Sequence, residues 1–562
     1  MQKINVAMVS RRSSMGEAPL ETTPDSSQSL RRFVEGIRAI GQSDTSLASA
    51  ISVALFVLCA WPLLLTEVPP YQDLPNHLAA AHILTHADKY PEFISNGFFK
   101  TNAALFAWLY FGGKVFGFAL ASRLFAAGTL AVGAFVYPRF FLELGGRRRM
   151  IVASFFVWPM VHNWFVSKGM LDFALGVPLS LALLMVIRRQ LEAPSLRRAA
   201  GILALSLCTW YAHGFSLLVA YMLVTIHAAQ HWRQLSSLAR RLAVPLAPAA
   251  LLTVYSVVRH WTEPTGAMSG YVEINELLPP WELGYNMWAE WCAGFTWLSI
   301  ASALPIIGGV WGLLRWRKVS PTFFGPVALL ALTGLYLAVP YTTTNWFHVS
   351  SRFVPYIWMA LLLRLPDDIP VRLKQLLLVG AATYSLGMGV DFVRLDHDRQ
   401  LFTAGMNAVP EGARLLPMVF QRKETSENTR SLLHAWGFYV VERNASAPLL
   451  FAHSRSFPIM YRDPPPARFH HLVLESFPTT MGNENWMCGS ERAFGIVTDD
   501  CNAEWNRRWD EFWRDATPRF DHVLMWAPPP RVLAAAPAGY RLKFHEGKLY
   551  IYERVPAAQA QR

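Results

Sequence analysis

The stretch Tyr71-Gln-Asp-Leu-Pro-Asn-His77 directly follows the first long apolar run of the chain, Ala48–Leu65. It places a carboxylate, an amide and an imidazole within a few residues, close to the point where a membrane helix would leave the bilayer. Polar groups in such a position are costly unless they have a task. We therefore interpret the rest of the chain as a scaffold that holds this segment over a lipid-facing cavity.

The overall composition indicates a membrane protein. Of 562 residues, 53% are hydrophobic and 16% are charged, whereas soluble chains carry about 25% charged residues. The 21 Trp residues suit bilayer interfaces and sugar-binding clefts. The net charge of +12 does not indicate a nucleic-acid partner, because the Arg residues form short clusters between apolar runs, as the positive-inside rule expects. We expect membrane lipids, and no nucleic acid, among the partners.

The order of apolar runs predicts the topology. Residues 1–48 are rich in Ser, Thr and Arg and are expected to form a disordered cytoplasmic tail. The region 49–391 is predicted to hold about eleven transmembrane helices, with the basic clusters Arg147–Arg149 and Arg315–Lys318 on the cytoplasmic side. Its first outer loop covers 67–118. The predicted fold class is therefore a polytopic α-helical membrane protein.

Three segments of this region carry more specific predictions. Thr101–Gly117 is only moderately apolar and is expected to lie along the outer interface. Ile151–Val166 is expected to cross the membrane as one span. Ala199–Gln230 is long enough for two short helices, which we expect to meet at Ala212-His-Gly214 near the outer face.

The composition changes from Asp391 onward to Pro, charged residues and short alternating stretches. We predict a small extracytoplasmic α/β or α+β domain over 392–562. Cys488 and Cys501 are expected to form a disulfide there if the domain lies outside the cytoplasm. The predicted strands are Leu449–Phe451, His471–Leu474, His522–Trp526 and Lys548–Glu553, and the predicted helix is Asn502–Arg514.

Asp73 and His77 are the first candidates for a chemical role. The carboxylate would orient or deprotonate a hydroxyl group, or help to hold a divalent cation, with His77 as its neighbour. The alternative is structural, because Asp73-Leu-Pro75 looks like a helix start in which the Asp side chain caps the first turn. Both interpretations stay open from the sequence.

Further polar side chains fall on the same outer side and are predicted to contact a substrate. Lys168 and Arg352 suit a bound phosphate, although each would also suit a lipid headgroup. His213 interrupts a long apolar run, where an ionisable group favours a function and a helix break is the alternative. The remaining candidates are Asn76, His162, Asp172, Asn345 and His348.

Motifs for a cytoplasmic nucleotide site do not occur. The chain has no GxGxxG after a strand, no Walker loop and no Ser nucleophile elbow. We also find no CxxC or His/Cys metal pattern, so the sequence fixes no cofactor. A divalent metal ion at Asp73 stays open.

With these residues placed, the chain resembles the GT-C superfamily of integral-membrane glycosyltransferases, which includes protein O-mannosyltransferases and the aminoarabinose transferase of lipid A. The resemblance rests on Asp73 in the first outer loop, on Gly117-Phe-Ala-Leu-Ala-Ser-Arg-Leu-Phe125 as the opening of the second span, on Ser351-Arg-Phe-Val-Pro355, and on a C-terminal outer domain. It implies transfer of a sugar from a polyprenyl-phosphate donor to a glycan, lipid or protein acceptor, with Asp73 as the acid/base.

The same resemblance implies a bacterial inner-membrane protein with a cytoplasmic N-terminus and a periplasmic C-terminal domain. The chain departs from the family in one respect, since Asp73 has no adjacent acidic partner; Asp172 and Asp88 are candidates for a second carboxylate. Two other functions stay open. One is a non-catalytic protein of envelope polysaccharide assembly or transport. The other is an exosortase-like transpeptidase that would use Cys292, His348 and Arg352.

Overall fold

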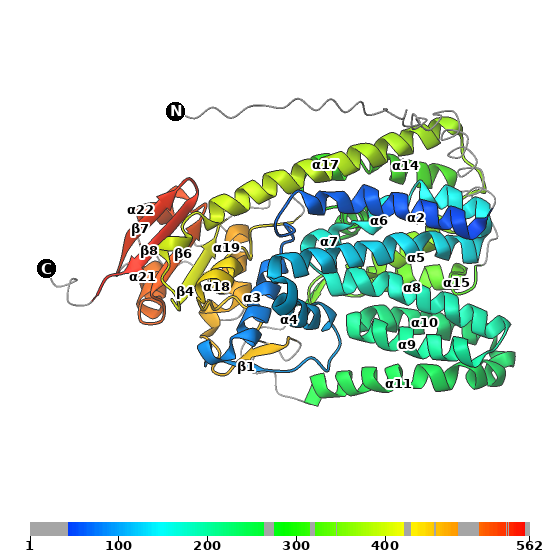
Figure 1. Cartoon of the computed structure of the whole chain (residues 1–562), viewed down its shortest axis with the longest axis horizontal. Helices are drawn as coiled ribbons and strands as arrows, with labels where there is room; N and C mark the ends of the chain where they lie inside the picture. Colours follow the sequence, from blue (N-terminus) through cyan, green and yellow to red (C-terminus); the bar gives the residue numbers. More distant parts are fainter. Residues whose placement is uncertain are drawn as a thin grey trace, which may run out of the picture.

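The computed structural model describes residues 43–262, 275–314, 321–343, 346–420, 429–453, 457–480, 505–535, 537 and 539–556. Within these ranges, a bundle of helices forms one part of the molecule and a mixed α/β region adjoins one of its ends (Figure 1). Of the predicted tail, residues 1–42 lie outside the described part, as do Asn345, Cys488 and Cys501.

The bundle is built from the apolar runs of the sequence. Five stretches among the described residues are long and apolar enough to cross a membrane: Asp44–Leu64, Phe118–Ser154, Leu171–Glu192, Trp232–Arg259 and Val371–Ala408. They confirm the predicted helical membrane class, while the count of about eleven spans stays a prediction. The bundle helices are α2 (Asp44–Ala60), α5 (Phe118–Ser154), α8 (Leu171–Glu192), α9 (Leu196–Ala212), α10 (Gly214–Gln230), α11 (Leu235–Thr262), α13 (Trp297–Ala301), α14 (Leu304–Leu313), α15 (Pro326–Ala338), α16 (Val354–Leu362) and α17 (Val371–Thr403).

Two of the segment predictions have clear outcomes. The long apolar run at 199–230 is two helices, α9 and α10, that meet at His213, as predicted. Ile151–Val166 is not one continuous span, because α5 ends at Ser154 and two short helices follow, α6 (Trp158–Val161) and α7 (Trp164–Lys168). Pro159 stands in the first turn of α6, and the Asn163 side chain caps α7 by accepting the Val166 N–H over 3.2 Å.

Ion pairs gather the basic clusters at one end of the bundle. Gly146 has a φ of 77°, which breaks α5 where the Arg cluster begins. Arg147 pairs with Asp44, the first residue of α2, at 2.5 Å. Arg149 pairs with Asp367, between α16 and α17, at 2.9 Å. This end lies away from the α/β region (Figure 1).

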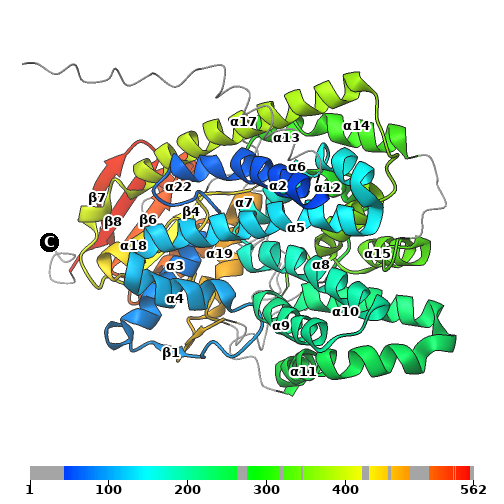
Figure 2. The same cartoon turned by 45° about the vertical axis from the view of Figure 1, so that its right-hand side comes forward.

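Segments from the first outer loop and from the C-terminal part meet at the opposite end. These loop elements are α3 (Leu74–Thr85), β1 (Phe93–Ser95) and α4 (Ala104–Phe116). β1 pairs antiparallel with β5 (Ile459–Tyr461), with Phe93 opposite Tyr461. The Tyr90 hydroxyl donates to the Val440 carbonyl in α18 (Gly437–Arg443) over 3.2 Å. α17 runs along the bundle and continues to the α/β region, as both views show (Figures 1 and 2).

A four-stranded sheet organises the C-terminal part. Its order is β4-β6-β8-β7, with β4 parallel to β6 and the other pairs antiparallel. A two-residue pair, β2 (Asn275–Glu276) with β3 (Thr342–Thr343), joins two loops near α12 (Pro280–Ala289). The sheet strands and helices are β4 (Leu415–Val419), β6 (His522–Trp526), β7 (Tyr540–Glu546), β8 (Leu549–Arg554), α19 (His471–Thr480), α21 (Trp505–Ala516) and α22 (Pro530–Ala534).

The strand predictions had mixed outcomes. His522–Trp526 forms β6, and β8 covers most of the predicted segment Lys548–Glu553. The prediction of a strand at His471–Leu474 is wrong, because these residues open α19, and Leu449–Phe451 forms no strand. Short apolar runs do not distinguish a buried strand from a buried helix turn.

Candidate functional site

Asp73 is held in place by the backbone of α7. The N–H groups of Gln72 and Asp73 donate to the carbonyls of Ser167 (3.1 Å) and Lys168 (3.0 Å). This approach requires Gly169, which ends α7 with a φ of 89°, because a Cβ there would lie 2.9 Å from the Asp73 nitrogen. Asp73 stands at the N-cap position of α3, but its side chain makes no capping hydrogen bond. The predicted helix start is therefore confirmed, whereas the predicted side-chain cap is wrong, because the Asp73 carboxylate bonds the Gln72 amide instead.

The side chains around this carboxylate form one network, which we call the Asp73 cluster. Its members are Gln72, Asp73, Lys168, Arg430, His434 and Glu475.

The Gln72 amide ties three chain segments together within this cluster. Its Nε2 donates to Asp73 Oδ1 at 3.1 Å. Its Oε1 accepts from Lys168 Nζ at 3.0 Å and from the Arg430 backbone N–H at 2.8 Å. One neutral side chain therefore fixes both a carboxylate and an ammonium group beside it.

His434 lies between two carboxylates. Its Nε2 is 3.4 Å from Asp73 Oδ1, and its Nδ1 is 3.9 Å from Glu475 Oε1. The imidazole is 1% exposed, and the two acidic side chains are nearly buried. Glu475 Oε1 accepts no hydrogen bond from the described residues. Asp73 thus has a second acidic side chain in its cluster, supplied by α19 rather than by the first outer loop.

The surroundings shift the pKa values of the two carboxyl groups in opposite directions. Burial alone would raise the pKa of Asp73, but the hydrogen bond from His434 and the charges of His434 and Lys168 outweigh it and hold that pKa below its ordinary value. Burial raises the pKa of Glu475 against the nearby charges of His434 and Arg430. The cluster therefore favours an ionised Asp73 beside a more readily protonated Glu475.

His77 and Asn76 follow on α3. The His77 ring contacts Phe106 and Phe451, with centroid distances of 4.9 and 5.9 Å. Burial lowers the pKa of His77 to about 4, against the opposing charge of Asp73, so this imidazole is neutral at ordinary pH. Asn76 is fully buried and bonds the Leu449 carbonyl and the Phe451 N–H at 3.1 and 3.2 Å. This geometry favours a positioning role for Asn76.

Arg352 lies among aromatic rings, in what we call the Arg352 cluster. Its guanidinium carbon is 5.8–5.9 Å from the ring centres of three aromatic residues. Its Nη2 donates to the Phe347 carbonyl at 3.3 Å, and among the described residues no carboxylate pairs with it. His213 packs on the same Phe173 ring at 5.1 Å. The cluster comprises Phe173, His213, Phe215, Trp346 and Arg352.

Trp164 in α7 connects the two clusters. Lys168 Nζ lies 5.5 Å from the Trp164 ring centre. Trp164 contacts Phe165 at 5.2 Å, and Phe165 contacts Phe173 of the Arg352 cluster at 4.6 Å. The same Trp164 ring packs on His348 at 4.7 Å. The predicted residues Asp73, Lys168, His213, His348 and Arg352 therefore belong to one continuous set of contacts.

Two predicted residues have other surroundings. His162 is fully buried, with Nδ1 3.3 Å from the Cys59 carbonyl oxygen, and packs against Tyr71. Asp172 accepts the Leu105 N–H at 2.8 Å, so it bonds the first turn of α4. Neither contact joins the Asp73 cluster, and Asp88 is exposed. The structure thus favours Glu475 over Asp172 and Asp88 as the second carboxylate.

The sequence reasoning missed four members of the Asp73 cluster. Gln72 stands inside the opening stretch and could have been weighed with its neighbours. Arg430, His434 and Glu475 lie in the C-terminal part, where no local pattern connects them with Asp73. No local sequence motif marks His453, His470 and His471, whose ligand-capable atoms nevertheless gather within 4.8 Å of one another in the structure. Asp73 belongs to no such group among the described residues, so a metal ion there stays a prediction.

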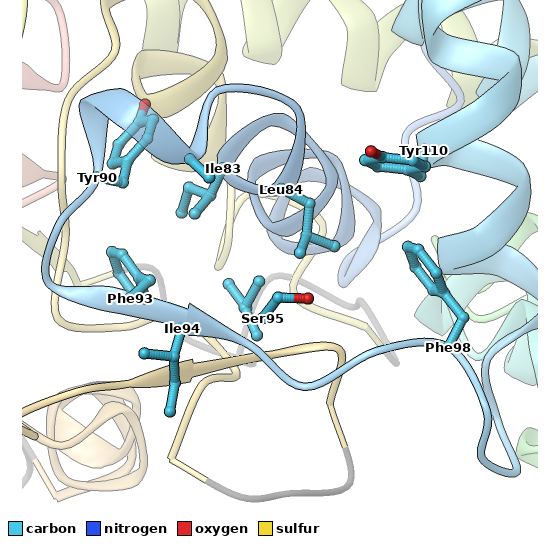
Figure 3. Close-up of a pocket in the computed structure, with 10 residues that line it drawn as sticks. Ile83, Leu84, Tyr90, Phe93, Ile94, Ser95, Phe98 and Tyr110 are labelled. Carbon is cyan, nitrogen blue, oxygen red and sulfur yellow. The ribbon is translucent and has the colours of Figure 1, made fainter.

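An apolar pocket lies at the C-terminal end of α3, the end opposite Asp73. It has a volume of about 280 Å³ and is lined by the end of α3, by β1 and by α4, with Ile83, Leu84, Phe93 and Phe98 among its residues (Figure 3). Tyr90 and Tyr110 face it from opposite sides (Figure 3). Its lining suits a hydrocarbon chain better than a sugar or a phosphate.

Comparisons with known proteins identify the fold. No protein-family model and no curated protein matches the chain. The crystal structure of ArnT from Cupriavidus metallidurans bound to undecaprenyl phosphate is similar over 92% of this chain and 99% of that one, with 12% identity and a TM-score of 0.50. A cryo-EM structure of the arabinofuranosyltransferase AftD from Mycobacteria covers 91% of this chain and 41% of that one, with 15% identity and a TM-score of 0.46. The predicted resemblance is thereby confirmed for the fold, which the chain shares with ArnT.

Proposed function

We propose that this protein is a membrane glycosyltransferase of the bacterial inner membrane. It transfers a sugar from a polyprenyl-phosphate-linked donor to a glycan, lipid or protein acceptor on the extracytoplasmic side. The observation that carries the proposal is the Asp73 cluster, a nearly buried carboxylate among cationic side chains, on a fold similar to that of an undecaprenyl-phosphate-binding transferase.

The chemistry requires a place for the departing phosphate. A sugar attached to phosphate already carries a good leaving group, so the protein mainly has to stabilise the negative charge that remains. Arg352 offers a planar guanidinium with no carboxylate partner among the described residues, and Lys168 offers an ammonium group whose position Gln72 fixes. We assign the phosphate to these two cations.

The acceptor must lose a proton during transfer. Cationic neighbours lower the pKa of Asp73 and keep it ionised, which is the protonation state that a base needs to accept the proton of an acceptor hydroxyl. His77 is the neutral imidazole next to it. Glu475 completes a pair of carboxylates around His434 and orients that imidazole against Asp73. A divalent cation at Asp73 remains part of the hypothesis.

The exosortase-like alternative fits the geometry poorly. Cys292 is fully buried, and burial raises the pKa of its thiol, whereas a nucleophilic Cys needs a lowered one. His348 Nδ1 bonds the Tyr341 hydroxyl at 2.6 Å. The experiment below distinguishes a non-catalytic role in polysaccharide assembly or transport from glycosyl transfer.

The test uses the full chain in native membranes. Lipid extracts are analysed by mass spectrometry for consumption of polyprenyl-phosphate sugars and release of polyprenyl phosphate, in strains that carry the wild type, Asp73→Asn or the exposed control Asp88→Asn. We expect product release with the wild type and with Asp88→Asn, and none with Asp73→Asn. Equal release with Asp73→Asn and the wild type would overturn the assignment of Asp73, and no release with any of them favours the non-catalytic alternative.

A further inference from the structure

Three histidines of the C-terminal part converge outside the Asp73 cluster. His453 follows the loop that bonds Asn76, and His470 and His471 stand at the start of α19. One ligand-capable atom from each lies within 4.8 Å of the other two. The rings of His453 and His470 are 4.0 Å apart between centroids, and those of His470 and His471 are 4.3 Å apart.

One ring nitrogen of His453 has a hydrogen-bond partner among the described residues, and the other has none. Its Nε2 lies 3.2 Å from the Pro448 carbonyl oxygen, which can only accept a hydrogen bond, so Nε2 carries the proton. Nδ1 therefore presents its lone pair, and it has no hydrogen-bond partner among the described residues although His453 is only 5% exposed. A backbone carbonyl that fixes the tautomer of an imidazole is the usual second contact of a metal-bound His.

The other two histidines complete the set. His471 Nδ1 is also buried without a hydrogen-bond partner among the described residues. His470 Nδ1 accepts the Leu472 N–H over 3.2 Å, a long contact. A metal ion would either replace that contact or bind the other nitrogen after a change of tautomer.

The distances between the three ligand-capable atoms are close to those between the ligand atoms of a zinc-bound site. Tetrahedral Zn²⁺ with Zn–N bonds of about 2.0–2.1 Å places its ligand nitrogens about 3.3 Å apart. Starting from nitrogens within 4.8 Å of one another, each ring needs to move inward by less than about 1 Å. The buried Nδ1 atoms of His453 and His471 have no hydrogen-bond partner among the described residues, an unfavourable state that a bound ion would relieve.

We propose that His453, His470 and His471 bind a divalent transition-metal ion, with Zn²⁺ as the ion that three neutral imidazoles suit best. Water fills the fourth position. The proposal does not depend on the transferase activity, because it rests on the three side chains alone.

The site would also stabilise the neighbourhood of Asp73. The His471 ring contacts Phe451 at 5.4 Å, and Phe451 contacts both His434 and His77, at 5.0 and 5.9 Å. Glu475 follows one turn after His471 on α19. A metal ion that fastens α19 to His453 therefore fixes the helix that carries the second carboxylate, which makes the three histidines positioning residues.

The experiment is a metal titration of the full chain, purified in detergent and stripped with EDTA. Zn²⁺ is added to the wild type, to His453→Gln/His471→Gln, and to the control His227→Gln/His231→Gln, which alters a similar His pair with a ring distance of 4.3 Å at another place in the bundle. We expect one tight Zn²⁺ in the wild type and in the control, and an affinity lower by more than about 100-fold in the double variant. Unchanged affinity in the double variant would overturn the proposal.

Two further measurements guard against a variant that fails to fold. Co²⁺ added to the stripped wild type should produce the visible absorption bands of a low-coordinate histidine site, and a spectrum identical to that of free Co²⁺ contradicts the proposal. Zn²⁺ should also raise the melting temperature of the wild type, because an ion that binds only the folded state stabilises it. A wild-type melting temperature that Zn²⁺ leaves unchanged counts against the site.

Discussion

The two ends of the helix bundle use charged side chains differently. At the end away from the sheet, Arg147, Arg149 and Arg189 each lie within 3 Å of a carboxylate, at 2.5, 2.9 and 2.7 Å. At the end that meets the α/β region, Arg352 faces aromatic rings. The ion-pair partner of Asp73 among the described residues is His434, at the longer distance of 3.4 Å, and the carboxylate also accepts from the neutral Gln72 amide at 3.1 Å.

This difference distinguishes charged side chains that are neutralised by a partner within the fold from those that remain available to attract a third group. A close exposed pair neutralises itself and has little attraction left for a third group, although it contributes only about 0–1 kcal/mol to stability. A guanidinium packed on aromatic rings keeps its charge and its donors. The residue type alone therefore does not mark a site; the partners of each side chain do.

The largest expected effect is that of Asp73→Asn. Loss of the base should reduce sugar transfer by about 10²–10⁴-fold, because proton transfer by a positioned side chain contributes about that much. The measurement is the rate of polyprenyl phosphate release in proteoliposomes. Asp172→Asn serves as a second comparison, since this buried carboxylate bonds α4 rather than the cluster. A loss of transfer in Asp172→Asn equal to that in Asp73→Asn, in a folded protein, would remove the distinction between the two.

The next effect concerns Arg352. Arg352→Ala should weaken binding of undecaprenyl phosphate and lower transfer by about 10²-fold, because one donor to a developing negative charge is lost. Arg352→Lys should recover part of this, since it keeps the charge but not the planar fork. Binding is measured by native mass spectrometry with the lipid phosphate as probe, and Arg189→Ala is the control from the other end. If Arg352→Ala and Arg189→Ala bound undecaprenyl phosphate with equal affinity, the proposed difference between the two ends of the bundle would be contradicted.

Much of the fold was predictable because apolar periodicity is a local signal. The run around His213 showed by its length and by Ala212-His-Gly214 that two helices meet there, and α9 and α10 do. The break of Ile151–Val166 was less visible, because it depends on Pro159 in the first turn of α6 and on the contact of the Asn163 side chain with the Val166 N–H. Only the folded chain shows that contact.

Only some members of the Asp73 cluster could be predicted from the sequence. Asp73 and Lys168 could be placed together because topology puts their loops on one face. His434 could not be added, because it contacts Asn76 across 358 positions of sequence and stands in an apolar stretch without any motif. Tertiary packing alone brings it and Glu475 to Asp73.

A smaller effect is expected for Glu475→Gln, with two readouts. Transfer should fall by about tenfold, because the charge that orients His434 is lost while the shape is kept. The free energy of unfolding at about pH 8, in contrast, should rise in this variant. Burial raises the pKa of Glu475, so its contribution to stability is full below the ordinary Glu pKa of about 4.3 and is lost as pH rises through the higher folded value.

The pH dependence of the melting temperature tests the predicted direction of this effect. Glu475→Gln should melt above the wild type at about pH 8, and the difference should close as the pH falls toward about 4. Asp73→Asn should show the reverse, because a lowered pKa gives stability that is present above the ordinary Asp value and lost on acidification. The two carboxylates would prove alike if both variants shifted the melting temperature in the same direction.

The smallest effect should come from Arg189→Gln at the opposite end. Its partner Glu143 also accepts a hydrogen bond from Arg189 Nε at 3.1 Å, so the substitution breaks a two-point contact. The pair is partly exposed, and its loss should cost about 0–1 kcal/mol of unfolding free energy. Transfer should stay within about twofold of the wild type, because this ion pair has no contact with either cluster. Chemical denaturation in detergent measures the first quantity and phosphate release the second. If Arg189→Gln reduced transfer as strongly as Arg352→Ala, charges at both ends would matter equally, and partner distances would lose their value as a guide to function.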